Sequence, residues 1–337
     1  MYVKSKTWYL LTVIVVIECQ EKNFTLIPLS PGSFRQILRT FTPVPKGRST
    51  TIHDTRIIYY NGSVEDHKWY RFDNIASLLS HPNFDLNKPT ALYIHGYVEY
   101  ATDNSILRVV RSYLKHGDHN MLVLDWSNLA FGNYLNVVLD VPLVGTETAK
   151  ALLRLVKKGF NIKNLHVIGH SAGAHVAAVL GRALKQNGYT LPRVTGLDPA
   201  SFGFYLPISA ASLNYKDASF VDIIHTDGGK YGSPFSLGHA DFWPNGGEAP
   251  QPGCPRRSIL FTIENFCSHW RSWLFYAESV VGGNFVARKS ADYDAFLRGY
   301  GRETALMGIS ASPGLRGNFY LQTATREPFA LGDRGSL

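Results

Sequence analysis

The chain of 337 residues contains only three cysteines, no low-complexity tract and no long run of charges of one sign. The lack of such tracts excludes a tethered or disordered array and favours a compact globular protein. No apolar run reaches the ~20 residues that a transmembrane helix requires, so we expect no transmembrane anchor. The length allows a large core, and we predict one domain over residues 20–337.

Residues 1–19 have the pattern of a secretory signal peptide. Lys4 and Lys6 precede an apolar stretch, residues 8–17, that is too short to cross a bilayer. Cleavage after Cys19 would remove one of the three cysteines. We therefore expect a secreted, extracellular protein.

The two remaining cysteines, Cys254 and Cys267, form an even pair in an oxidising compartment. We predict that one disulfide joins them. Asn23 and Asn61 each begin an N-x-S/T sequon, which suits a secreted chain.

Basic residues outnumber acidic ones, and the formal net charge is +8 at pH 7. A basic exported protein is attracted to anionic surfaces, such as lipid or glycan. The basic residues are scattered and no nucleic-acid-binding motif accompanies them, so we predict no nucleic-acid partner.

Short apolar runs typical of strands alternate with helical patterns. One helix face is predicted over residues 106–114, before a capping Gly117, and a second over residues 148–156. Apolar strands separated by helices indicate a mostly parallel sheet covered on both faces, which is an α/β-hydrolase fold. The expected strands are residues 56–60, 91–94, 121–125, 165–168, 194–197 and 221–225.

The second half of the chain is less regular. Residues 228–255 are rich in glycine, proline and aromatic residues, and we expect long ordered loops there. A late helix is predicted over residues 269–281. The tail, residues 292–337, is expected to be irregular, with one strand at 318–322.

Ser171 is the candidate nucleophile. It lies in Gly169-His170-Ser171-Ala172-Gly173, between an expected strand and an alanine-rich helical stretch. A strand that turns directly into a helix holds the intervening serine in a strained conformation with its hydroxyl exposed. The two glycines allow strand and helix to pass closely.

A serine hydroxyl needs a histidine that accepts its proton and a carboxylate that orients the histidine. The order in this fold is serine, acid, histidine. We choose Asp198, because it ends the next strand, and His269, at an expected loop-to-helix junction beside Cys267. Other candidates remain open: Asp222, Asp227 and Asp241 for the acid, and His225 and His239 for the base.

Two backbone N–H groups must also stabilise the oxyanion of the tetrahedral intermediate. One comes from the residue after the nucleophile, Ala172, and the other from an earlier strand-end loop. Tyr97 is the candidate there, because Gly96 allows the backbone to turn its N–H toward the site.

These segments together resemble the pancreatic lipase family of secreted animal lipases and phospholipases, and above all its single-domain insect-type members. The resemblance extends over roughly residues 74–281. It is carried by IHGY (94–97), VIGHSAGAH (167–175), TGLDPA (195–200), FVDIIHTD (220–227), GHADF (238–242) and PNGG (244–247). It places the family's triad on Ser171, Asp198 and His269, and its oxyanion donors on Tyr97 and Ala172.

The sequence departs from the digestive lipases of this family in three respects. We expect no C-terminal β-sandwich domain and therefore no colipase partner. Ala172 stands where many relatives have leucine. At the family's structural calcium site, Asp217 is present but Asn214 replaces a second aspartate. We therefore predict no metal and no cofactor, and the ester chemistry requires none.

In relatives the disulfide-closed segment, residues 255–266 here, is a lid. Its short length resembles the phospholipase A1 members. Arg256 and Arg257 could contact phosphate, and Ile259, Leu260 and Phe261 could contact acyl chains; alternatively, the segment is a solvated turn and a strand-like run packed on the body.

We therefore expect a secreted serine ester hydrolase that acts at a membrane, micelle or lipoprotein surface and cleaves the sn-1 ester of phospholipids. The alternatives are a triacylglycerol or galactolipid lipase, or a non-catalytic yolk-type lipid-binding protein. The intact triad speaks against the last of these.

Overall fold

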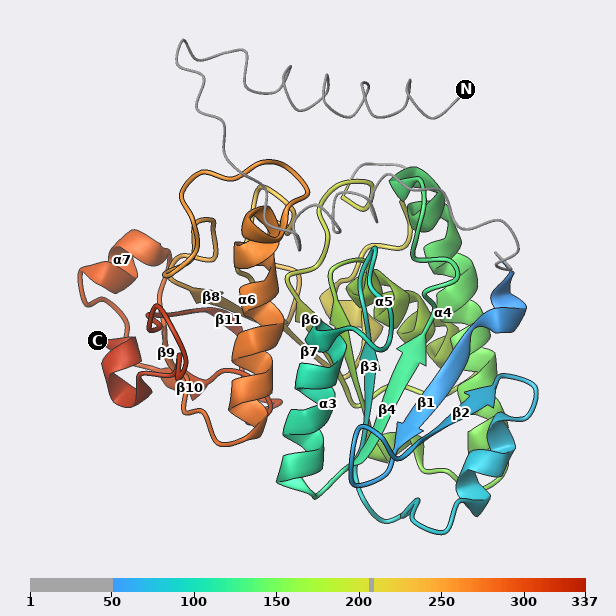
Figure 1. Ribbon diagram of the computed structural model, residues 1–337. Helices are drawn as coiled ribbons and strands as arrows, with labels where there is room; N and C mark the ends of the chain where they lie inside the picture. Colours follow the sequence, from blue (N-terminus) through green and yellow to red (C-terminus); the bar gives the residue numbers. More distant parts are fainter. Residues whose placement is uncertain (1–50, 206–208) are drawn as a thin grey trace, which may run out of the picture.

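The computed structural model describes residues 51–205 and 209–337 (Figure 1). The expected signal peptide, Cys19 and Asn23 lie outside these residues. Asn61 lies between β1 and β2, where its side-chain amide donates to Asp66 at 2.6 Å. No helix in the described part of the chain is both long and apolar enough to cross a membrane.

One mixed sheet of eleven strands runs through the described residues in the order β10-β9-β11-β8-β7-β6-β5-β3-β4-β1-β2. The central strands, from β4 through β11, pair in parallel, whereas β1, β2, β9 and β10 join antiparallel at the two edges. The strands are β1 (Arg56–Tyr60), β2 (His67–Arg71), β3 (Thr90–Ile94), β4 (Asn120–Asp125), β5 (Leu165–His170), β6 (Arg193–Leu197), β7 (Phe220–Ile224), β8 (Ala240–Pro244), β9 (Val286–Lys289), β10 (Thr304–Leu306) and β11 (Gly317–Leu321).

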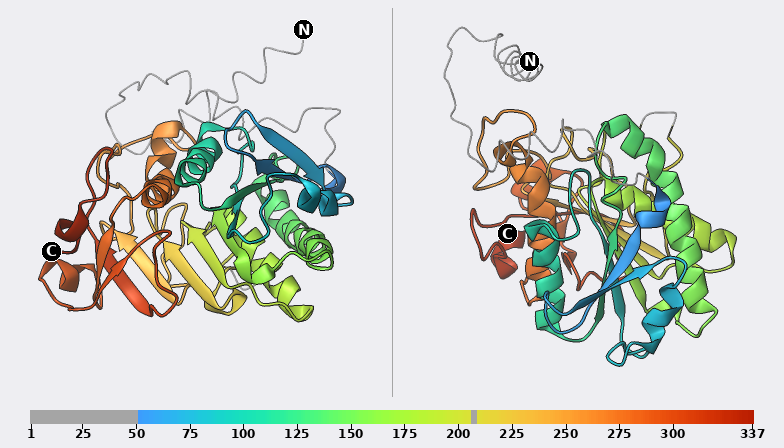
Figure 2. Two further views of the ribbon diagram at one scale, coloured as in Figure 1. Left: turned by 90° about the horizontal axis from the view of Figure 1, so that it is seen from below. Right: turned by 45° about the vertical axis from the view of Figure 1, so that its right-hand side comes forward.

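Helices cover both faces of this sheet, as Figure 2 shows. On one face lie α3 (Asn104–His116) and α6 (Ile263–Val280), and on the other lie α4 (Tyr134–Val156) and α5 (Ala172–Gln186). A short helix, α7 (Tyr293–Leu297), follows β9. The arrangement confirms the predicted α/β-hydrolase fold.

Two apolar cores result from the alternation of side chains along buried strands. In β3, Leu92 and Ile94 pack in the core under α4 and α5, whereas Ala91 and Tyr93 pack in the core under α3 and α6. All four side chains are fully buried. Their uniform apolarity is therefore the signature of a strand covered on both sides.

The helix α3 agrees with its predicted face and ends at Gly117, whose φ of 83° is left-handed. The helix α4 begins at Tyr134, well before the predicted start at residue 148, and Asn133 caps it. The sequence pattern missed this half because Leu135, Leu139 and Leu143 are exposed, so apolar residues surround the helix instead of marking one face.

Two further expectations were wrong. The helix α6 starts at Ile263 rather than at residue 269, so His269 lies inside a helix and not at its junction with a loop. The region 228–255, predicted to be loops, contains the strand β8 between β7 and β11. Its last residue is Pro244, and proline interrupts the hydrogen-bonding of a strand least at the strand end. The antiparallel strands β2, β9 and β10, and the helix α7, were not predicted.

Candidate active site

Ser171 stands between β5 and α5 with φ 53° and ψ −121°, a strained conformation for a residue other than glycine. Its N–H donates to the carbonyl of Leu197 at 2.9 Å. Glycines on both sides are required sterically: a Cβ at Gly169 would lie 2.5 Å from Cα of Ala174, and one at Gly173 would lie 2.4 Å from the carbonyl oxygen of His95. The predicted strand-turn-helix context of Ser171 is thus confirmed.

Asp198 follows β6, the neighbour of β5 in the sheet, and it is fully buried. Its Oδ2 lies 2.6 Å from Nδ1 of His269. Its other oxygen, Oδ1, accepts the backbone N–H groups of Thr226 at 2.8 Å and Asp227 at 3.0 Å. These contacts fix the carboxylate and direct Nε2 of His269 away from it.

His269 is 4 % exposed and lines the same pocket as Ser171. Burial lowers the pKa of His269, and the hydrogen bond and negative charge of Asp198 counteract only part of this effect. The imidazole is therefore neutral near pH 7, the form in which it can accept a proton.

The other candidates for acid and base are engaged elsewhere, with one exception. Asp222 accepts two hydrogen bonds of 2.8 Å from Arg193. Asp241 lies 2.9 Å from Nε2 of His225, and Nδ1 of His239 accepts the N–H of Val221.

The exception is Asp227, which clusters with Asp198 and His269. Burial and the neighbouring charge of Asp198 raise the pKa of Asp227 to about 8. Two adjacent buried carboxylates cannot both be readily ionised, and the one bonded to His269 has the more favourable partner for its charge.

The loop after β3 passes directly over the nucleophile. A Cβ built on Gly96 would lie 3.0 Å from Cβ of Ser171, so the backbone that leads to Tyr97 contacts the elbow. Ala172 is the first residue of α5, where the N–H has no acceptor within the helix. The two N–H groups chosen from the sequence thus belong to segments that meet at Ser171.

Sequence reasoning missed one buried charge at this place. Glu99 is 6 % exposed, and its Oε2 accepts the N–H of Gly96 at 2.8 Å and lies 3.2 Å from Nδ1 of His170. Burial alone would raise the pKa of Glu99, but His170, His95 and Ser105 outweigh burial and lower the pKa to about 2. Glu99 follows Gly96 by three residues in the sequence, but no local pattern distinguishes it from a solvent-exposed loop glutamate.

A pocket of about 570 Å³ opens in front of these groups. Aromatic residues form a large part of its lining, namely Tyr97, Tyr134, Phe202, Tyr231, Phe261, Phe266 and Trp270. An apolar pocket with a few convergent polar groups is typical of a small-molecule or lipid site.

The sequence comparison identifies the family. The family model named Lipase matches residues 35–329. This chain belongs to the lipase family. A pancreatic triacylglycerol lipase of Oryctolagus cuniculus is 32% identical over 290 residues, which cover 80% of this chain and 60% of the relative. The pancreatic lipase-related protein 2 of Homo sapiens is 32% identical over 72% of this chain and 55% of its own length.

The chain thus spans little more than half the length of the curated relatives that it matches. The resemblance to pancreatic lipases inferred from the motifs is confirmed. The activities in the relatives' names are those of the relatives themselves.

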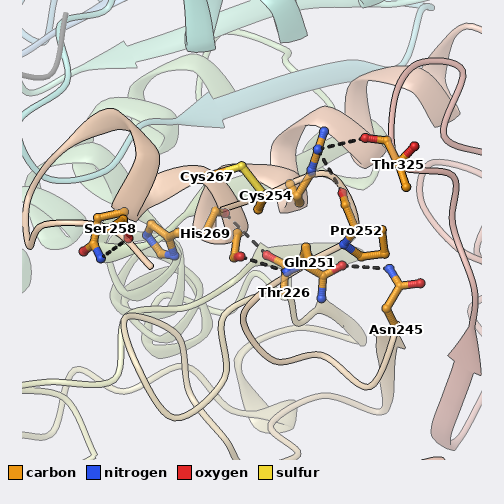
Figure 3. Close-up of a disulfide and its surroundings, with 12 residues drawn as sticks. Thr226, Asn245, Gln251, Pro252, Cys254, Ser258, Cys267, His269 and Thr325 are labelled. Atoms are coloured by element: carbon orange, nitrogen blue, oxygen red, sulfur yellow. Dashed lines mark hydrogen bonds between the residues drawn. A yellow bond between two sulfur atoms is a disulfide. The ribbon is translucent and has the colours of Figure 1, made fainter. Parts of the chain in front are cut away.

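The predicted disulfide of this lipase-family member is present: Cys254 and Cys267 are bonded, with their Cα atoms 5.7 Å apart. Cys267 lies in α6, two residues before His269 (Figure 3). The incoming loop is also held by the N–H of Gln251, which donates to Oγ of Ser268 at 3.0 Å. Two adjacent links therefore hold the loop at the helix turn that carries His269.

The segment between the cysteines is only partly as expected. Phe261 and Phe266 line the pocket, but Ile259, Leu260, Arg256 and Arg257 are absent from the lining. Both arginines and Leu260 are exposed. The alternative strand-like run is not formed, because the segment turns at Phe261, with φ 63°, and enters α6 two residues later.

Lys230 lines the pocket, although the sequence analysis did not single it out. Its ammonium group donates to the carbonyl of Asn265 at 3.1 Å and lies 5.1 Å from the ring centre of Tyr231. Among the described lining residues it is the one lysine or arginine.

Asp217 and Asn214, at the position of the family's calcium site, contact other groups of the protein. Oδ1 of Asp217 accepts from Arg182 at 2.8 Å, and Oδ2 accepts the N–H of Asn214 at 2.8 Å. Asn214 in turn caps the short helix Tyr215–Asp217. A guanidinium beside the carboxylate does not fit Ca²⁺, which requires a cage of oxygen ligands.

Proposed function

We propose that this protein is a secreted carboxylic ester hydrolase that acts on lipid esters through an acyl-enzyme on Ser171. The observation that carries the proposal is that His269, hydrogen-bonded to Asp198 at 2.6 Å, lines the same pocket as the strained serine. An aromatic wall suits the acyl chain of a lipid and contributes little to the binding of a polar substrate.

In the proposed reaction, Nε2 of His269 removes the proton of the Ser171 hydroxyl while Oγ bonds to the ester carbonyl carbon. The N–H groups of Tyr97 and Ala172 stabilise the oxyanion that forms. His269 then donates its proton to the departing alcohol oxygen, and the carbon–oxygen bond of the ester breaks. A water molecule repeats the sequence, releases the fatty acid and restores Ser171, while Asp198 remains ionised throughout.

We propose glycerophospholipids as the preferred substrates, with cleavage at the sn-1 ester. A phospholipid carries a phosphate that a triacylglycerol lacks, and Lys230 provides a cation at the wall of the pocket. Arg256 and Arg257, both exposed in the segment between the two cysteines, add positive charge that attracts an anionic surface.

The surface beside the pocket also suits a lipid aggregate. Tyr134, which lines the pocket, begins α4, and the exposed Leu135 and Leu139 follow on that helix. Phe202, 62% exposed, stacks on Tyr134 with ring centres 5.9 Å apart. Exposed apolar side chains at a pocket entrance support contact with the acyl region of a lipid surface.

One alternative has support from the comparisons, since several of the relatives are named triacylglycerol lipases. The deciding experiment compares fatty-acid release by purified protein from mixed micelles of 1-palmitoyl-2-oleoyl phospholipid and from emulsified trioleoylglycerol. We expect faster release from phospholipid, with palmitate as the product. Faster release from trioleoylglycerol would assign a triacylglycerol lipase, and oleate from the phospholipid would refute the sn-1 position.

The same assay separates an enzyme from a lipid-binding protein. The variant Ser171→Ala retains the pocket and should bind micelles, but it should release no fatty acid. If the wild-type protein binds micelles without hydrolysing any ester, the proposed function is wrong and a binding protein is the better description.

A further inference from the structure

Glu99 connects the two segments that the proposed reaction uses. It belongs to the loop after β3, yet its carboxylate points back to the start of that loop, where Oε2 accepts the N–H of Gly96 at 2.8 Å. The same oxygen lies 3.2 Å from Nδ1 of His170, the last residue of β5. Oε1 accepts the hydroxyl of Ser105, in the first turn of α3, at 2.7 Å.

Each of these partners is adjacent to a reacting group. Gly96 precedes Tyr97, whose N–H is a proposed oxyanion donor, and His170 precedes Ser171. The ring of His170 lies 4.7 Å from the ring of His269, centre to centre. One carboxylate thus contacts both the loop that carries the donor and the strand end that carries the nucleophile.

The carboxylate is a permanent acceptor. It faces imidazoles from two elements, His170 at the end of β5 and His95 after β3, and together with Ser105 they lower the pKa of Glu99 to about 2 despite its burial. An ionised carboxylate accepts on both oxygens and donates from neither. Nδ1 of His170 therefore serves as the donor in this contact.

That arrangement leaves Nε2 as the ring nitrogen of His170 that Glu99 does not contact. This atom is buried, and it has no hydrogen-bond partner among the described residues. His170 also lines the pocket. A buried polar atom without a partner is costly in a folded protein, and beside a pocket an accepting ring nitrogen of this kind points to a bound water that donates to it.

We propose that Glu99 is a positioning residue that sets the distance between the oxyanion donor of Tyr97 and the hydroxyl of Ser171, and that it fixes the ring of His170 at the wall of the pocket. The inference rests on the proposed acyl transfer. Its energetic basis is that two hydrogen bonds of a buried carboxylate restrain a loop whose N–H must meet the oxyanion within a few tenths of an ångström.

The kinetic test compares Glu99→Ala and Glu99→Gln with the wild type on a p-nitrophenyl ester. Removal of one oxyanion donor costs about 10²–10³-fold in kcat, and a displaced donor should cost less, so we expect about a 10- to 100-fold loss for Glu99→Ala with little change in KM. Glu99→Gln retains an oxygen that accepts from Gly96 and should recover most of the rate. Glu147→Ala, a half-buried glutamate of α4 that pairs with Lys150 and does not line the pocket, is the matched control and should behave as wild type.

A second readout distinguishes oxyanion positioning from a general loss of structure. The thiono analogue of the ester places sulfur, a poor acceptor, at the oxyanion position. Because the oxygen ester gains more from the donors, Glu99→Ala should lower its rate by a larger factor than the rate of the thionoester. Equal factors for both substrates, or a kcat within threefold of wild type, would overturn the proposal.

Hydrogen exchange tests the link without any turnover. In Glu99→Ala, the peptides that cover residues 95–99 and 169–172 should exchange faster, while those in β6 and β7 should not change. Unchanged exchange at residues 95–99 would refute the proposed restraint. If the wild-type protein hydrolyses no ester, the proposed function fails, and this measurement still decides whether Glu99 joins the two segments.

Discussion

Oδ2 of Asp198 lies 2.6 Å from Nδ1 of His269, although 71 residues separate them in the chain. The sheet makes this contact possible, because Asp198 emerges at the carboxyl end of β6, beside the end of β5 that delivers Ser171. Parallel strands place their carboxyl ends at one edge, where α/β folds gather catalytic groups.

The first prediction separates the two neighbouring carboxylates. Asp198→Asn should lower kcat by about 10³–10⁴-fold, because an amide there favours the wrong tautomer of His269 and does not stabilise its cation. Asp227→Asn should retain activity within tenfold, since its pKa of about 8 makes Asp227 a neutral acid at pH 7. The measurement is steady-state hydrolysis of a soluble ester, and equal losses in the two variants would make the assignment of Asp198 wrong.

The value of kcat/KM should decrease as the pH is lowered below 7. The pKa of His269 is lowered from 6.5 chiefly by burial, so the group is neutral, and active as a base, above a folded-state pKa that lies below 6.5. The logarithm of kcat/KM should therefore rise with pH and reach a plateau before pH 7. An acid limb with its midpoint above pH 7 would contradict the environment described for His269.

The same shift affects stability. Because the unfolded chain binds a proton to this histidine at a higher pH than the folded protein does, His269 disfavours folding as pH falls below 6.5. The effect is absent above that pH. Replacing His269 by Gln should therefore reduce the acid sensitivity of the midpoint of thermal unfolding relative to wild type, because the titrating group is gone.

The disulfide should matter more to activity than to the fold. Cys254→Ser with Cys267→Ser removes a short loop constraint worth about 3 kcal/mol and frees the loop that is linked to the α6 turn with His269. A small displacement of a catalytic group is costly, so we expect a roughly tenfold or larger loss of kcat in protein that is still folded at 25 °C. Circular dichroism verifies the folded fraction. A loss of rate no larger than the unfolded fraction would show that the bond serves stability alone.

Lys230 should influence the choice of substrate. Lys230→Ala should lower kcat/KM for phospholipid micelles by about 3- to 10-fold, the range for a partly exposed ion pair, and leave trioleoylglycerol hydrolysis unchanged. Lys150→Ala, an exposed lysine of α4 paired with Glu147, is the control for net charge. An equal decrease for both lipids would assign Lys230 to the support of α6 through Asn265 instead.

Much of the sheet was predictable because its central strands are buried on both faces and have continuous apolar runs, as in residues 91–94 of β3 and 121–124 of β4. The elbow around Ser171 was predictable because strand, turn and helix each have a local signature. The edge strand β2 was not, because its sequence, His67–Arg71, is mostly polar and half exposed, and only its pairing with β1 makes it a strand.

The site could be predicted only where chemistry marks the residue type. Asp198 and His269 could be chosen from their motifs and their order in the chain. The sequence could not exclude Asp222, Asp227 and Asp241 as the acid, because the residue that a carboxylate contacts depends on the tertiary structure. Glu99 and Lys230 illustrate the same limit. Their roles depend on contacts with residues that are distant in the sequence or on how the loop folds, and a local sequence pattern does not predict such contacts.

The central claim is that Ser171 forms the covalent acyl-enzyme, and labelling with a p-nitrophenyl alkylphosphonate tests it most directly. The reagent phosphonylates an activated serine and releases p-nitrophenol, and peptide mass spectrometry locates the adduct. The account predicts one adduct, on Ser171, that appears in step with the loss of ester hydrolysis and does not form in His269→Gln. An adduct on another serine, or full hydrolysis with Ser171 labelled, would contradict it.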